Sequence, residues 1–68
     1  MAHWEQYEVW RLNGTRWEPI GWFPDLALAN AVARGRQSAV RVIHVQYEGG
    51  REVSREVLAE IGAMRQQP

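Results

Sequence analysis

The chain contains no cysteine, and His3 and His44 are its only histidines among 68 residues. A chain this short supports one core, so residues 1–68 are expected to form a single small domain. Domains of this size are stabilised by disulfides, a structural metal, oligomerisation or dense apolar packing. Disulfides are excluded, and two distant histidines without a second ligand at zinc-like spacing give no metal site. We therefore expect no metal or cofactor, and stability from packing or self-association.

The chain also lacks lysine, and its eight arginines balance eight acidic residues. A net charge of zero creates no global field that would attract nucleic acid or an anionic membrane. The distribution is uneven, because residues 26–47 carry Arg34, Arg36 and Arg41 without an acid, whereas both flanks are mildly acidic. This basic segment is the candidate contact for a nucleic acid or an acidic partner.

Long apolar runs are missing too. No stretch approaches the ~20 residues of a membrane helix, and the N-terminus shows no basic-then-apolar signal. We expect a soluble, cytoplasmic protein without a membrane partner.

Residues suited to catalysis are scarce. The chain has one aspartate, two histidines and neither a glycine-rich phosphate loop nor a nucleophile elbow. His44 lies between apolar neighbours and is interpreted as a structural histidine rather than a general base. We therefore expect a protein that is not an enzyme.

An Asn13-Gly14 pair between aromatic and β-branched stretches predicts a hairpin with strands at residues 6–12 and 15–23. A two-residue loop at this pair would set Trp10 opposite Trp17 but also Arg11 opposite Arg16. Because like charges oppose in that register, a bulged register is the alternative. Pro19 cannot donate to a ladder, which predicts a sheet edge or a bulge.

The segment after this hairpin predicts a helix. Asp25 is a suitable N-cap, and Gly35 is suited to a left-handed residue ending the helix. The apolar residues form one alanine-rich stripe that would let the helix lie close to the sheet; they are Leu26, Leu28, Ala29, Val32 and Ala33.

Residues 40–47 predict a central third strand, since both of its faces are apolar.

After this strand, apolar residues at helical spacing predict a second helix from about residue 54, capped by Ser54. A fourth strand paired across Gly49-Gly50 is the alternative. On the helix, Glu52, Glu56 and Glu60 would form an acidic row, either solvated or complementary to the basic segment.

The expected fold class is therefore α+β, a small β-β-α-β-α domain packed by helices. Its three-stranded antiparallel or mixed sheet would have the strand order 2-1-3, with the third strand antiparallel to the first.

Both faces of the predicted hairpin are apolar. One carries Tyr7, Val9, Ile20 and Trp22, and the other carries Trp4, Trp10, Leu12, Trp17 and Phe23. A tryptophan buries about 150–250 Å2, so leaving several exposed would cost much of a small domain's stability. The first helix can cover only one face. The tryptophans are ordinary core packing, anchors of a protein interface, or stacking platforms for bases or small ligands.

We expect a non-enzymatic protein-interaction module, such as an accessory subunit, adaptor or inhibitor, that binds a protein partner or forms a homodimer. The expected interface residues are Trp4, Trp10, Trp17, Val57, Leu58, Ile61 and Met64. The alternative is a nucleic-acid-binding domain that uses Arg34, Arg36 and Arg41.

Overall fold

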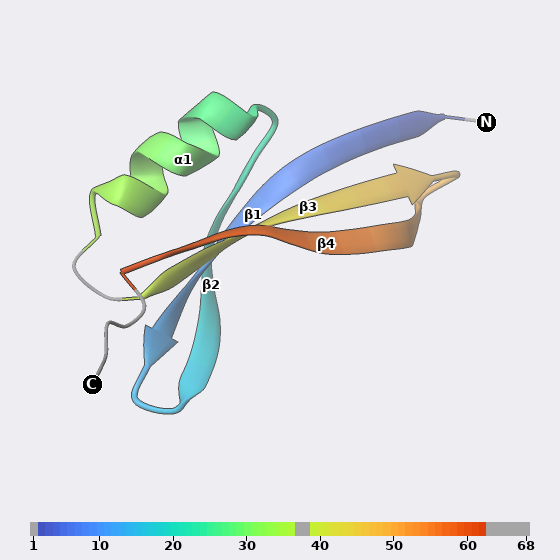
Figure 1. Ribbon diagram of the computed structural model, residues 1–68. Helices are drawn as coiled ribbons and strands as arrows, with labels where there is room; N and C mark the ends of the chain where they lie inside the picture. The colour runs from blue at the N-terminus through green and yellow to red at the C-terminus, as the bar shows by residue number, and fades with distance from the viewer. Residues whose placement is uncertain (1, 37–38, 63–68) are drawn as a thin grey trace.

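A computed structural model describes residues 2–36 and 39–62. Over these residues the chain forms four strands and one helix (Figure 1). The elements in chain order are β1 (His3–Asn13), β2 (Arg16–Phe23), α1 (Leu26–Arg34), β3 (Val40–Glu48) and β4 (Arg51–Ile61). All neighbouring strands are antiparallel, in the order β2-β1-β3-β4. The predicted order of the first three strands is thus confirmed.

The predicted fold of three strands and two helices is wrong, because residues 51–61 form β4 instead of a second helix. Gly49 and Gly50 have φ angles of 60° and 83°, the left-handed pair that a tight hairpin turn requires. The register of β4 against β3 shifts twice, between Val42 and Ile43 and between Gln46 and Tyr47. Each shift inserts one extra β4 residue, so its apolar residues lose strict alternation and imitate helical spacing.

The first hairpin has a different register from the predicted one. Its loop is Gly14-Thr15, with Asn13 opposite Arg16, and Gly14 has a φ of 68°. This register sets Arg11 opposite Glu18, which replaces the repulsive arginine pair by an ion pair of 3.5 Å. Unlike charges opposite each other favour the observed register.

A bulge in β2 redistributes the aromatic side chains. Trp10 pairs with Pro19 whereas Val9 pairs with Gly21, so Ile20 is an extra residue in β2. One extra residue moves every later side chain to the other face. The prediction that Phe23 shares the face of Trp10 and Trp22 the face of Val9 is therefore wrong. Phe23 packs against the core, and Trp22 lies opposite Glu8 on the Trp10 face.

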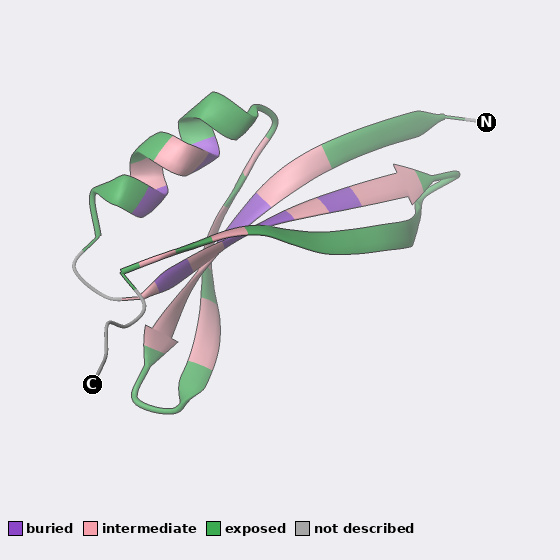
Figure 2. Cartoon of the chain, in the orientation of Figure 1, coloured by how far each residue is buried: buried purple, intermediate pink, exposed green. Residues whose placement is uncertain are grey.

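Helix α1 lies over one end of one sheet face, and β1, β3 and β4 continue beyond it (Figure 1). Ala29 and Ala33 are fully buried against Val9, Val40 and Val42, which confirms that alanines bring the helix close to the sheet. Much of the outer surface of the helix is coloured as exposed in Figure 2. The apolar stripe that contacts the sheet is narrower than predicted, because Leu26 and Leu28 are exposed.

Neither end of α1 has the capping geometry that the sequence predicts. Asp25 is the N-cap, but its side chain makes no capping hydrogen bond; its carbonyl accepts the amide of Ala29 at 3.1 Å. Gly35 has a φ of −82°, so the predicted left-handed residue is wrong. Within the described residues no helix has the length and apolar character needed to cross a membrane.

The dense packing between α1 and the sheet generates a prediction. Ala33→Leu should lower the free energy of unfolding by about 1–3 kcal/mol, because the added atoms have no space beneath the helix. Ala31→Leu is the matched control on the exposed side of α1 and should change it by less than about 0.5 kcal/mol. Urea unfolding followed by circular dichroism measures both. Equal effects of the two substitutions would contradict the observed helix packing.

Candidate functional site

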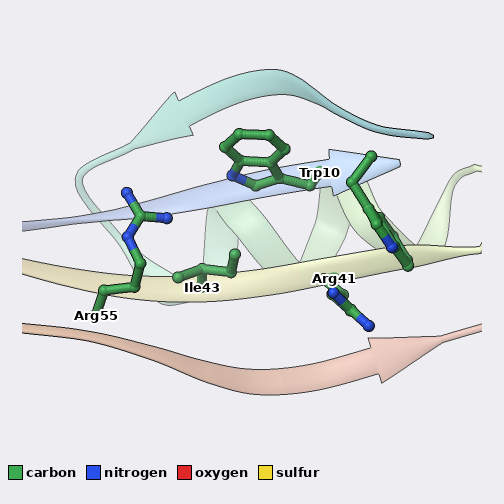
Figure 3. A pocket seen from close by; sticks show the side chains of 5 residues that line it. Trp10, Arg41, Ile43 and Arg55 are labelled. Carbon is green, nitrogen blue, oxygen red and sulfur yellow. The ribbon is translucent and has the colours of Figure 1, made fainter. Parts of the chain in front are cut away.

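The sheet face opposite α1 gathers all four tryptophans, and we name it the Trp face. Strand register places on it residues from every strand: Trp4, Glu8, Trp10, Trp17, Trp22, Arg41, Ile43, Val45, Tyr47, Glu52, Arg55, Val57 and Glu60. Figure 3 shows Trp10, Ile43 and Arg55 in front of the sheet, with α1 behind it. Over the described residues this face has no helix across it.

A buried carboxylate lies at the centre of the Trp face. Glu8 is only 3% exposed, and its Oε1 accepts hydrogen bonds from Trp10 Nε1 at 2.8 Å and Arg55 Nη1 at 3.2 Å. Arg55 belongs to β4 and therefore reaches across β3 to meet Glu8 on β1. A buried charge is tolerated only when it is paired and hydrogen-bonded, so Arg55 and Trp10 satisfy Glu8 together.

Arg55 also binds a carboxylate on its own strand. Its Nε and Nη2 donate to Glu52 at 2.8 and 3.1 Å. These hydrogen bonds hold the pKa of Glu52 below its ordinary value and, with the charges of Glu52 and Glu8, raise the pKa of Arg55 above its ordinary value. Arg55 is thus a permanent cation fixed between two acids.

A second arginine covers an indole ring. The guanidinium carbon of Arg41 lies 4.1 Å from the centre of the Trp17 ring, a cation–π contact. Its Nε donates to Glu60 at 2.9 Å. The Trp17 ring is therefore shielded by a side chain whose charge is balanced by its neighbour on β4.

Between the two arginines the Trp face is hollowed. An open cavity of about 220 Å3 is lined by Trp10, Trp17, Arg41, Ile43 and Arg55 (Figure 3). Sites for drug-sized ligands measure about 300–1,000 Å3, so this cavity suits a smaller group such as one large side chain. The aromatic and arginine lining is typical of pockets that receive interface anchors.

Exposed apolar side chains lie on the same sheet face as the cavity. Trp22 on β2 is 57% exposed, Val57 on β4 is 48% exposed, and Trp4 is 45% exposed while stacking on Tyr47 with ring centres 4.2 Å apart. Gln6 donates to the Tyr47 hydroxyl at 3.3 Å, which fixes that ring. The Trp face therefore combines a buried centre with exposed apolar side chains at Trp4, Trp22 and Val57.

The opposite face beyond α1 is polar instead. His44 bonds to Glu5 and stacks on Tyr7, and His3 lies 3.7 Å from Glu48. His44 thus has structural partners. Exposed aromatic surface of the sheet is consequently concentrated on the Trp face.

The structure brings together most of the predicted interface residues. Trp4, Trp10 and Trp17 share the Trp face with Val57, whereas Leu58 is an exposed bulge residue of β4. Ile61 instead packs toward the core beneath α1. Met64 lies outside the described residues.

Four members of this surface were not predicted from the sequence: Glu8, Trp22, Ile43 and Arg55. A proline inside β2 signalled the bulge that redirects Trp22. No local pattern signals the contact between Arg55 and Glu8, which are 47 residues apart.

The three arginines of the basic segment do not form one patch. Arg34 ends α1 and Arg36 follows it, both exposed, whereas Arg41 lies on the Trp face.

The predicted acidic row is divided between the two faces of the sheet. Glu52 and Glu60 share the Trp face, but Glu56 pairs with His44 on the other face. The suggested complementarity is present within the chain in the pair Arg41–Glu60.

Among residues 2–36 and 39–62, no three His, Asp or Glu side chains gather as a metal site would require.

No protein-family model, curated protein or solved structure matches this chain. The geometry of the Trp face is therefore the basis for a functional proposal.

The buried carboxylate generates a stability prediction. Arg55→Met should lower the free energy of unfolding by about 1–3 kcal/mol, because Glu8 then lacks its cation in a buried position. Arg51→Met, an exposed site on the same strand, should change it by less than about 0.5 kcal/mol. Urea unfolding measures both. The double variant Glu8→Leu/Arg55→Met should lose less than Arg55→Met alone; a larger loss would contradict the buried-charge explanation.

The contact between Glu52 and Arg55 generates a pH prediction. The Glu52 carboxyl should titrate below its ordinary pKa of 4.5 in an NMR titration. Because the folded-state pKa is lowered, its contribution to stability is present above 4.5 and is lost as the pH falls through the folded-state pKa. In Arg55→Met the Glu52 pKa should return toward the ordinary value. An unchanged pKa in that variant would contradict the contact.

Proposed function

We propose that this chain is a non-enzymatic protein-interaction module that uses the Trp face as its contact surface. The observation that supports the proposal is the gathering of four tryptophans on the sheet face opposite α1, with Trp4 and Trp22 exposed. Tryptophan and arginine are the residues most enriched in binding hot spots, and here they line one cavity together. A cytoplasmic location, expected from the sequence, is part of the same proposal.

The sheet edges are poorer contact sites than the Trp face. The β2 edge carries Pro19 and a bulge, and the β4 edge carries two bulges and five charged residues. Prolines, bulges and charges are the devices by which proteins prevent strand addition. A partner that binds this sheet would therefore bind its face.

The charges of the Trp face favour a protein over a nucleic acid. Arg41 and Arg55 are each paired with carboxylates of the same face, Arg41 with Glu60 and Arg55 with Glu8 and Glu52. Three acids against two arginines leave no cation surplus for phosphates, which dominate nucleic-acid affinity. Stacking of bases on Trp4 or Trp22 would thus lack electrostatic support.

Site-specific photo-crosslinking tests the proposal. A photoreactive amino acid replaces Val57 on the Trp face in one variant and Leu28 on the outer surface of α1 in a matched control. Both positions are about half exposed, so access to solvent does not distinguish them. In cells that express the chain, the Val57 variant should form discrete covalent adducts of protein mass and the Leu28 variant should not. Adducts from both positions alike, or from neither, would contradict the proposed surface.

A further inference from the structure

We infer that the partner of the Trp face is a second copy of this chain, packed face to face as a homodimer. This inference rests on the proposed function and names its partner. In a twofold dimer the same surface faces itself, so each copy covers the other's tryptophans.

The core within one copy of the chain is small. The largest fully buried side chains among the described residues are four valines: Val9, Val40, Val42 and Val45. A domain of this size needs further apolar burial or a covalent or metal support for stability, and the chain has no cysteine. A second copy is present whenever the chain is made, so it can supply this burial without a separate gene product.

The broad face of the chain has a limited area. The chain measures 47 × 21 × 17 Å, so its broad face offers on the order of 1,000 Å2 as an upper limit. Stable interfaces bury about 800 Å2 from each partner. A dimer that buries this area must therefore cover most of the broad face, as face-to-face packing does, whereas the 220 Å3 cavity alone suits only a single side chain.

The charges of the Trp face are compatible with a second copy of the chain. The acids and arginines of the Trp face are interleaved and paired within the chain, so a second copy meets no broad patch of like charge. Self-pairing along the β4 edge is less favourable. Antiparallel pairing about Glu56 would set Glu52 opposite Glu60 of the second copy, and pairing about Arg55 would set two arginines opposite each other. Packing through the Trp face avoids the like-charge pairs of these two edge registers.

Sedimentation equilibrium of the full chain over a wide concentration range tests the inference. The wild-type chain should be a dimer, and acrylamide quenching of its tryptophans should increase on dilution. Trp22→Ser should raise the dimer Kd roughly 30-fold, because it removes the most exposed indole of the Trp face. Leu28→Ser, on the outer surface of α1, should leave the Kd unchanged.

Several outcomes would overturn the homodimer. A wild-type monomer at all concentrations, or a dimer weakened by Leu28→Ser and not by Trp22→Ser, would do so. If Trp22→Ser does not fold, the dilution dependence of wild-type quenching decides, since a concentration-independent signal contradicts the dimer. A monomer whose Val57 variant crosslinks to a different protein would contradict the homodimer while supporting the proposed function. Failure of both experiments would contradict the proposed function as well.

Discussion

The alternation of side chains along β2, and its interruption at one residue, determines the surface of this domain. Without the extra residue Ile20, Phe23 would leave the core and Trp22 would lie beneath α1. With it, the helix side of the sheet carries aliphatic residues together with Tyr7 and Phe23, and every indole lies on the other side of the sheet. A local irregularity in one edge strand thereby separates a compact core from an aromatic surface.

The aromatic surface is stabilised by arginines in place of a second layer. Arg41 covers the ring of Trp17, and Arg55 reaches over β3 to a buried glutamate. Arginine side chains combine long apolar stems with fixed charges, so they shield a sheet while their heads stay hydrogen-bonded. Val45 on this face is completely buried although the described residues place no helix over it. These contacts thus cover part of the Trp face and leave a cavity and exposed indoles.

The sequence predicted the elements with simple signals and failed where bulges break the pattern. The first hairpin, the alanine-rich helix, the central third strand and the edge position of Pro19 are all observed. The extra residues in β4 made Val53, Val57, Leu58 and Ile61 resemble one helical stripe, although the positive φ angles of Gly49 and Gly50 close a hairpin there. For the candidate site, Trp4, Trp10 and Trp17 were predictable from composition. Arg55 was not, because its partner Glu8 is brought near only by strand order.

The position of the tryptophans would connect the stability of this fold to any association through the Trp face. The residues with the largest capacity for apolar burial lie outside the core, whose fully buried side chains are valines and alanines. Burying the exposed part of those indoles therefore adds to a small intramolecular core the apolar area that it lacks. Because the ion pairs already satisfy the charges of the Trp face, a partner need not supply counter-charges and can contribute apolar contacts alone. Any protein that covers this surface should consequently increase the free energy of unfolding of the chain, and that increase grows with the logarithm of the ratio of its free concentration to its Kd.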